Sequence, residues 1–426
     1  MTSDDTIPVA VIGAGPYGLS VAAHLSAKGI PFRIFGEPMG SWRHNMPDSM
    51  FLKSEGHASS LSDPAGQDTF GSFCKAQRIP YRNFGLSIPN DVFISYGLDF
   101  QRRHAPRVEE TAVTGLRRSA RGFELTLENG KTVRCSHVVL AIGFLPFRHL
   151  SGIPSGLDPG RLSHSADHHD FSPFSGKRVC VIGAGASATD VAAALHAAGA
   201  RPRIVSRADR FEWVSRRTDT PRFEKFATRD VLGGGRYGQG YVFSQLPHLY
   251  RYLPGKMRVR IAHTYLGPRG GWPVRDLVES LPNLLRSKIV RAHQRPDEVS
   301  LVLRRADGYI QTIHVDHVIA ATGYKIDLAR IAALPADLRG AIKTLGGAPE
   351  LSSHFESSVP GLYFVGYAAM HSFGPLMRFV AGSRFAASRT VGAIAASLAR
   401  RPRPAEAIAM SPPSPAARVL SATERK

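Results

Sequence analysis

The sequence is poor in three features that would assign it to a class at once: cysteines, long apolar runs and acidic residues. Its 426 residues contain only three cysteines, Cys74, Cys135 and Cys180, which are far apart and include no C-x-x-C pair. This spacing argues against a redox-active disulfide and predicts a reducing, cytoplasmic environment. No run approaches the roughly eighteen apolar residues of a membrane span. Because Met1 to Pro8 contain two aspartates and no apolar signal segment, we expect no secretion either.

Acidic residues are outnumbered, with 34 Asp and Glu against 54 Lys and Arg, for a net charge of +20. The basic residues are spread along the chain rather than collected in one block, so we expect no nucleic-acid binding. A positive field of this kind favours anionic cofactors and substrates. The composition, 43% hydrophobic and 21% charged, is that of a globular protein, and the length predicts two or three domains.

The features that are present begin with a short apolar strand, Val9 to Ile12, that runs directly into a glycine turn and a helix. Gly13 permits the tight turn, Gly15 lets the backbone approach a pyrophosphate, and Gly18 lets the helix pack against its strand. Pro16 suits the first helical turn, where its missing N–H is not needed. The helix N-terminus then presents N–H groups and the positive end of its dipole to phosphates. The sequence therefore predicts a dinucleotide site here.

An acidic residue, Glu37, stands nineteen residues after Gly18, where a carboxylate is expected to accept hydrogen bonds from the adenosine ribose. Since free ribose hydroxyls suffice for this contact, the first site fits FAD. A loop follows, and its Trp42 either fills the surface or walls a flavin ring. Lys53 lies within the apolar run from Met50 to Ser54 and either snorkels to solvent or contacts substrate or flavin.

A second strand, glycine turn and helix begin at Arg178. Gly183 and Gly185 repeat the first two glycines, and Ala188 replaces the third, which is an allowed variant. Nineteen residues after Ala188 the chain carries Ser206 and Arg207 in place of an acid. Because an arginine can pair with a 2′-phosphate that a carboxylate would repel, the second cofactor is predicted to be NADPH.

Each turn is followed by a hairpin signal and an apolar strand that stops at glycine, which forms an internal repeat. Asn129-Gly130 leads to Gly143, and Asp307-Gly308 leads to Gly323. Residues 212–275 lie between the second turn and its hairpin and are rich in Arg, Gly, Tyr and Pro. We expect them to form a mainly helical insertion that covers the substrate. A last buried strand ends at Gly366, and a helix runs to about Arg400. Residues 401–426 have the composition of a disordered tail.

The two turns, the repeat and the stretch Ala321-Thr322-Gly323-Tyr324 together resemble the class B flavoprotein monooxygenases, over about residues 7–395. This group includes flavin-containing, Baeyer–Villiger and N-hydroxylating enzymes. The group's fingerprint before the second turn is matched in part: Gly160 and His164 are in register, but Asp158 and His168 replace the flanking aromatics. The NADPH signature is matched by Gly183, Gly185, Ser187 and Ala188.

The resemblance implies site residues, which it carries over position by position. In the N-hydroxylating branch a lysine that matches Lys53 contacts the carboxylate of an amino-acid substrate. Lys53, His164 and Arg378 are the candidates for catalytic or substrate contacts, and no metal ligand is expected. The expected cofactor contacts are Gly13, Gly15, Pro16, Gly18, Glu37, Trp42, Gly143, Gly183, Gly185, Ser187, Ser206, Arg207, Thr322, Gly323, Tyr324, Gly366 and Gly374.

The implied fold is α/β, with two Rossmann-like dinucleotide-binding domains, the second inserted into the first. The FAD domain takes residues 1–155 and 316–400, and the NADPH domain takes residues 156–315. The implied activity is that of a monooxygenase: NADPH reduces FAD, the reduced flavin captures O₂ as a C4a-(hydro)peroxyflavin, and one oxygen passes to a small nucleophilic substrate centred on nitrogen, sulfur or carbon.

Two alternatives stay open at this point. One is an NADPH-dependent flavin reductase or oxidase without substrate oxygenation, and the other is a degenerate nucleotide-binding protein. Disulfide reductases share the architecture of two nucleotide domains. They use a cysteine pair beside the flavin, which this chain lacks, and a Gly-Asp pair where this chain has Gly366-Tyr367.

Overall fold

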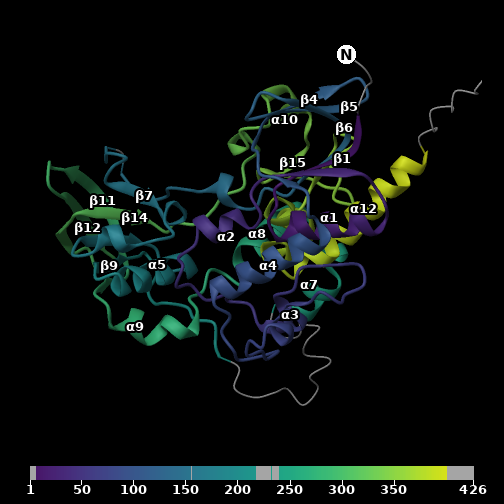
Figure 1. Cartoon of the computed structure of the whole chain (residues 1–426). Coiled ribbons are helices and arrows are strands. Elements are labelled where there is room, and N and C mark those ends of the chain that lie inside the picture. The colour runs from purple at the N-terminus through teal and green to yellow at the C-terminus, as the bar shows by residue number, and fades with distance from the viewer. Residues whose placement is uncertain (1–5, 155, 217–231, 233–238, 401–426) are drawn as a thin grey trace, which may run out of the picture.

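The computed structural model describes residues 6–154, 156–216, 232 and 239–400, which form two lobes (Figure 1). Each lobe is built on a mainly parallel sheet that begins with a buried apolar strand and a glycine turn. The first lobe carries the labels β1, α1 and α12, and the second carries β9, β14 and α5. This arrangement confirms the predicted α/β class with two Rossmann-like units.

The sheet of the first lobe has the strand order β3-β2-β1-β6-β5-β4, with β17 beside β6. Val9, Ala10 and Val11 of the central strand are fully buried, since both faces of a parallel sheet are covered. Its strands are β1 (Ile7–Ile12), β2 (Phe32–Phe35), β3 (Val108–Glu109), β4 (Val113–Ser119), β5 (Gly122–Leu127), β6 (Thr132–Leu140) and β17 (Leu362–Phe364). Its longer helices are α1 (Pro16–Ala27), α3 (Phe70–Ala76), α4 (Asn90–His104) and α12 (Gly382–Arg400).

The sheet of the second lobe has the order β10-β9-β8-β14-β7, and a separate antiparallel sheet joins β11, β12 and β13. The strands are β7 (Leu162–His164), β8 (Arg178–Ile182), β9 (Arg201–Val205), β10 (Asn283–Leu284), β11 (Ser287–Gln294), β12 (Val299–Arg305), β13 (Ile310–Val315) and β14 (His317–Ala320). The helices are α5 (Ala186–Ala197) and α9 (Arg275–Ser280).

The internal repeat is visible in both lobes as an antiparallel hairpin that feeds the parallel sheet. In the first lobe β6 pairs with β5 and continues into a parallel pairing with β1. In the second lobe β13 ends at Val315 and a new strand, β14, pairs in parallel with β8. Residues 317–320 therefore lie in the second sheet, although the sequence analysis assigned 316–400 to the first domain.

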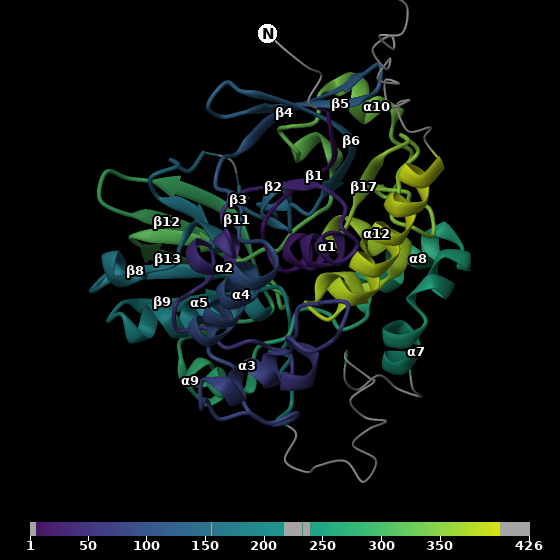
Figure 2. The ribbon, with the colours of Figure 1, turned by 45° about the vertical axis from the view of Figure 1, so that its right-hand side comes forward.

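The insertion at residues 212–275 is mainly helical where the structure describes it. Figure 2 shows α7 (Gln239–Gln245) and α8 (Gly255–Thr264) on the flank of the first lobe beside α12. A Cβ at Gly374 would lie 3.0 Å from the ring of Tyr250, so the insertion packs directly on the C-terminal segment. The triple glycine at 233–235 and the tail at 401–426 lie outside the described residues.

Short elements complete the chain. The short helices are α2 (Gly40–His44), α10 (Ala336–Ala341) and α11 (Met370–Phe373), and the short strands are β15 (Thr344–Leu345) and β16 (Ala348–Pro349). Short 3₁₀ turns include η3 (Ser165–Asp167), η6 (Pro247–Tyr252), η7 (Trp272–Val274) and η10 (Pro375–Arg378). Among the described residues, no helix combines the length and apolar character needed to cross a bilayer.

Candidate nucleotide-binding sites

The first glycine turn has the geometry of a phosphate cradle. Gly13 has φ +108°, and a Cβ there would lie 2.3 Å from the carbonyl oxygen of Ala141 on the neighbouring strand connection. A Cβ at Gly18 would lie 1.8 Å from the oxygen of Gly13, so helix α1 packs against the turn itself. At Gly15 the space is open, with no atom within 4 Å of a Cβ. Helix α1 starts at Pro16 with no acidic residue in its first turn, so its N-terminus suits an anion.

Glu37, the predicted ribose partner, follows strand β2 and is held by an arginine and a histidine side chain. Its Oε1 lies 2.6 Å from Arg43 and 2.7 Å from His44, both on helix α2. Because Oε1 already has these partners, Oε2 is the oxygen placed for a further acceptor role. These two partners were not predicted from the sequence, although their position just after Glu37 is a signal for local pairing.

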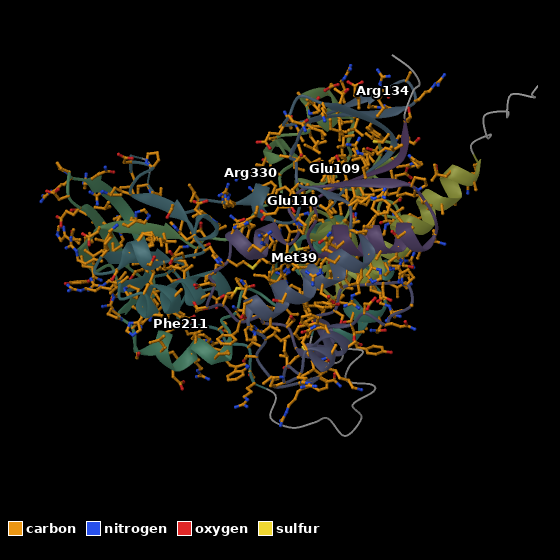
Figure 3. All side chains as sticks on the ribbon, viewed as in Figure 1. Met39, Glu109, Glu110, Arg134, Phe211 and Arg330 are labelled. Atoms are coloured by element: carbon orange, nitrogen blue, oxygen red, sulfur yellow. The ribbon has the colours of Figure 1, made fainter. Side chains whose placement is uncertain are left out.

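Trp42 lies on α2 and packs on helix α4, with its ring centroid 4.5 Å from that of Phe93. Its backbone carbonyl accepts a hydrogen bond from Asn90 Nδ2 at 3.1 Å. Met39, labelled near the middle of the molecule in Figure 3, starts this helix with φ +56° and bonds its N–H to the carbonyl of Ala14. The Trp42 segment is therefore attached to the first turn through Met39.

The glycines that end the apolar strands differ in their surroundings. Gly143 and Gly323 have φ +66° and +81° and open space around a Cβ. A Cβ at Gly366 would lie 3.3 Å from the ring of Tyr17, and one at Gly374 would meet Tyr250. The space around an added Cβ is therefore open at the first two glycines and filled at the last two.

Arg378 lies on η10 and reaches into the insertion. Its Nη2 donates to the carbonyls of Tyr265 at 2.6 Å and Leu266 at 3.1 Å. Burial lowers the pKa of this guanidinium, and its buried Nε has no hydrogen-bond partner among the described residues. A buried donor without a partner is costly, so Nε suits a contact with an acceptor on a bound ligand.

The second glycine turn repeats the backbone of the first but not its open space. Gly183 has φ +136°, and a Cβ there would lie 2.5 Å from the oxygen of Ala321. A Cβ at Gly185 would lie 2.7 Å from Cβ of Pro268, a residue of the insertion. Pro268 therefore fills, at the second turn, the space that is open beside Gly15 at the first turn. This contact could not be predicted from the sequence, because no local pattern links residues 185 and 268.

The predicted 2′-phosphate position lies in a turn that is held by backbone hydrogen bonds. Ser206 is buried, and its Oγ accepts the N–H of Ala208 at 3.1 Å. The N–H of Arg286 donates to the carbonyl of Ala208 at 2.8 Å. Ser206 thus shapes the turn, and Arg207 is presented on the surface. Ser187 is half-buried in the first turn of α5, which carries no acidic residue there.

Lys53 joins the two lobes. Its Nζ donates to Asp190 on helix α5 and to the carbonyl of Phe51 at 3.1 Å. Asp190 is 7% exposed; burial raises the pKa of its carboxyl group, and the ammonium of Lys53 opposes that rise. Because a buried carboxylate needs a cation, Lys53 is already paired without a substrate. Asp190 was missed in the sequence, although an acid on an otherwise apolar helix face signals a buried partner.

His164 caps the 3₁₀ turn η3 and fixes the backbone beside Gly323. Its Nδ1 accepts the N–H of Ala166 at 3.1 Å, so Nε2 carries the proton and donates to the carbonyl of Gly323 at 3.3 Å. Burial lowers the pKa of His164 and keeps the ring neutral. Both ring nitrogens are therefore occupied within the protein.

Thr322 and Tyr324 belong to the same crossing between the lobes. Thr322 Oγ1 donates to the carbonyl of His149, and the carbonyl of Tyr324 accepts from the hydroxyl of Tyr367 at 3.2 Å. Arg330, labelled between the lobes in Figure 3, donates to the carbonyl of Arg148. These contacts bring His164, Thr322, Gly323 and Tyr324, which the resemblance named separately, into one cluster.

The three thiols are free and buried, in α3, β6 and β8. Burial raises the pKa of Cys135 and of Cys180 to about 12 and also raises that of Cys74. Such thiols stay protonated and are poor nucleophiles. Among the described residues, no group of His, Cys, Asp and Glu is arranged to hold a metal ion.

Comparison with known proteins places this geometry in a family. The model of the family described as pyridine nucleotide-disulphide oxidoreductase matches residues 7–231, slightly more than half of the chain. The chain belongs to this family. The match covers the first glycine turn, the second turn and the Arg207 segment. Family membership thus rests on the nucleotide-binding units and not on a cysteine pair.

Among curated proteins, an indole-3-pyruvate monooxygenase of Oryza sativa subsp. japonica is 28% identical over 214 residues, which are 47% of this chain and 48% of that protein. The chain spans about half the length of most of the curated relatives it matches. These relatives support the resemblance to the class B flavoprotein monooxygenases.

Two solved structures show how widely the fold is shared. An ornithine N-hydroxylase of Kutzneria sp. 744, with reduced FAD, NADP⁺ and L-ornithine, has a TM-score of 0.72 at 17% identity, over 92% of this chain and 100% of that one. A bacillithiol disulfide reductase of Staphylococcus aureus has a TM-score of 0.62 at 18% identity, over 92% and 99%. At these identities the comparison shows the fold alone.

Proposed function

We propose that the chain is an FAD-dependent, NADPH-using monooxygenase that transfers one oxygen atom of O₂ to a small nucleophilic substrate. The observation that carries this proposal is a pair of glycine turns, one in each lobe, in a chain whose thiols are all buried and protonated. Two dinucleotide sites would supply a hydride donor and a flavin. The buried thiols argue against a protein disulfide as the acceptor, and we take O₂ as the acceptor because the curated relatives are monooxygenases.

FAD fits the first turn. Its pyrophosphate would lie at Gly15 and the N-terminus of α1, where the structure leaves open space. Glu37 Oε2 would accept from the ribose, while Arg43 and His44 hold the carboxylate in position. Gly143 gives the backbone close access, and Arg378 Nε is a buried donor that suits a flavin acceptor. When bound, the flavin supplies the hydride acceptor and the site of O₂ reduction.

NADPH would use the second turn, with Arg207 on its 2′-phosphate. The residues of this chain then have positioning roles. His164 fixes the Gly323 backbone, and the pair of Lys53 and Asp190 holds the second lobe against the first. Because both His164 nitrogens are bonded, we assign it no proton transfer. A cytoplasmic location fits three free thiols.

The substrate we propose is nitrogen-centred, because the Kutzneria neighbour of the same fold is an ornithine N-hydroxylase. Sulfur- and carbon-centred nucleophiles are the alternatives. Since Lys53 is already paired with Asp190, this lysine does not offer a free charge to a substrate carboxylate.

The test measures oxygen transfer and flavin retention together. Purified protein should be yellow, and amines should accelerate NADPH oxidation with products heavier by one oxygen. Gly15→Val places a branched side chain in the open space and should give folded, colourless protein. A Gly15→Val protein with full flavin would contradict the site, and accelerated NADPH oxidation with only peroxide as product would favour an oxidase.

A further inference from the structure

The segment from Tyr265 to Trp272, here called the strap, crosses from the first lobe to the second glycine turn. It contains Gly267, Pro268, Gly270 and Gly271, and it follows helix α8 of the insertion. A Cβ at Gly185 would lie 2.7 Å from Pro268 Cβ and 3.2 Å from its Cγ. In a dinucleotide fold the second glycine faces the pyrophosphate, so the strap and the pyrophosphate need the same space.

The first end of the strap is held by Arg378. Its Nη2 donates to the carbonyls of both Tyr265 and Leu266, at 2.6 Å and 3.1 Å. Leu266 has φ +47°, a left-handed conformation that a leucine adopts rarely and at a cost. A strained backbone of this kind persists only where the surroundings hold it. Arg378 supplies such support, because it binds the carbonyls of the two peptide groups that flank the Leu266 Cα.

The second end of the strap is held by the second lobe. The N–H of Gly270 donates to Glu212 at 2.8 Å, and the carbonyl of Gly270 accepts from Val214 at 2.9 Å. A Cβ at Gly270 would lie 2.4 Å from the Trp213 ring, so only glycine fits. A Cβ at Gly271 would lie 3.5 Å from Lys53 Cε, beside the Lys53–Asp190 pair that joins the lobes.

We infer that the strap is an autoinhibitory cover of the second turn, and that Pro268 and Arg378 act as positioning residues that set the affinity for pyridine nucleotide. NADP(H) reaches the N-terminus of α5 only after Pro268 leaves Gly185. The apparent affinity is then the intrinsic affinity reduced by the fraction of molecules with the strap displaced. This inference rests on the proposed function, because it takes the second turn as the NADPH site.

The first experiment measures NADP⁺ affinity of the flavin-loaded protein by calorimetric titration. Pro268→Gly removes the ring that lies over Gly185, and Arg378→Lys keeps the charge but loses the contact with both carbonyls. Because Arg378 Nε is also proposed to contact the flavin, Arg378→Lys is compared with wild type at equal flavin content. Both variants should bind NADP⁺ about threefold to tenfold more tightly than wild type. Pro335→Gly, at the N-cap of α10, is the control and should leave the affinity unchanged. Unchanged or weaker binding by Pro268→Gly would overturn the inference.

The second experiment follows amide hydrogen exchange with and without NADP⁺. The N–H groups of Gly270 and Val214 lose their partners when the strap leaves, so NADP⁺ should accelerate their exchange. Slower exchange at both amides would mean that the strap stays in place as part of the site, against the inference.

A third experiment separates the strap from the proposed function, because it needs no nucleotide. Gly185→Ala should lower the melting temperature in wild type, where the new methyl group meets Pro268, and much less in a Pro268→Gly background. Equal losses in both backgrounds would overturn the strap geometry. If this coupling is found but no variant binds NADP⁺, the proposed function fails and the strap remains as a structural contact.

Discussion

The two glycine turns of this chain share a backbone and differ in what surrounds it. Both begin with a glycine at positive φ, where an added Cβ would lie 2.3 Å from the oxygen of Ala141 at Gly13 and 2.5 Å from the oxygen of Ala321 at Gly183. The second glycine is open at residue 15 and covered by Pro268 at residue 185. The motif therefore determines the shape of the turn, and distant parts of the chain determine whether a ligand can reach it.

The third glycine position shows the same contrast. At Gly18 a Cβ would lie 1.8 Å from the oxygen of Gly13, whereas the second turn carries a buried Ala188 at this place. Helix α5 therefore leaves room for a methyl group at this position, and α1 does not. The predicted ribose positions differ as well: the Glu37 carboxylate is bound by Arg43 and His44, whereas Arg207 is exposed.

The largest expected effect is that of Gly18→Ala. Its new methyl group meets backbone that cannot yield, so we expect a loss of at least about 3 kcal/mol in the free energy of unfolding, together with loss of flavin. The matched change Ala188→Gly removes a methyl group at the same place and should cost about 1 kcal/mol. Chemical denaturation and flavin absorbance measure both. Equal losses in the free energy of unfolding would show that the two helices pack equally closely against their turns.

Arg207→Ala tests the ribose contrast with a smaller effect. A guanidinium makes charge-assisted hydrogen bonds worth about 1.5–3 kcal/mol, so the affinity for NADPH should fall roughly tenfold to a hundredfold. NADH should be nearly unaffected, because it lacks the phosphate, and Arg207→Glu should reduce NADPH use further. Flavin-reduction rates with each nucleotide measure this. If NADH and NADPH lose equally, Arg207 supports the fold instead of binding the phosphate.

The smallest expected effect concerns two histidines at equivalent positions of the repeat, His137 and His317. Burial, with nearby positive groups, lowers the pKa of His317 to about 4, and its Nε2 lies 2.8 Å from Ser163 Oγ. Since the unfolded state, with a pKa near 6.5, binds this proton first, stability is complete above about pH 6.5 and falls toward pH 4.

We expect His317 to account for about 1 kcal/mol of the stability lost between pH 7 and pH 5.5. His317→Asn should flatten the pH dependence of the unfolding free energy by that amount. His137→Asn, on β6, is the control: it measures how much free energy of unfolding is lost when a histidine is removed from the matching strand of the first lobe. An unchanged slope in His317→Asn would mean that His317 titrates as it does in the unfolded chain.

Much of the fold could be predicted from local sequence, because strands, turns and helix starts depend on neighbouring residues. The apolar strands, the two turns and the helices after them are confirmed, and so is the two-unit α/β architecture. The insertion is helical where it is described, and its α7 and α8 lie against the first lobe. The hydrogen-bond partners of the predicted site residues could not be read from the sequence. Lys53 was considered for a substrate carboxylate, and it is paired with Asp190.

What the sequence determined by itself is the pair of dinucleotide turns, the charge at each ribose position and the lack of a C-x-x-C pair, because each is a property of contiguous residues. Only the tertiary structure decided that β14 joins the second sheet, that both nitrogens of His164 are used and that Pro268 covers Gly185. These contacts link residues far apart in the chain. They follow from how the lobes and the insertion pack, which no local periodicity encodes.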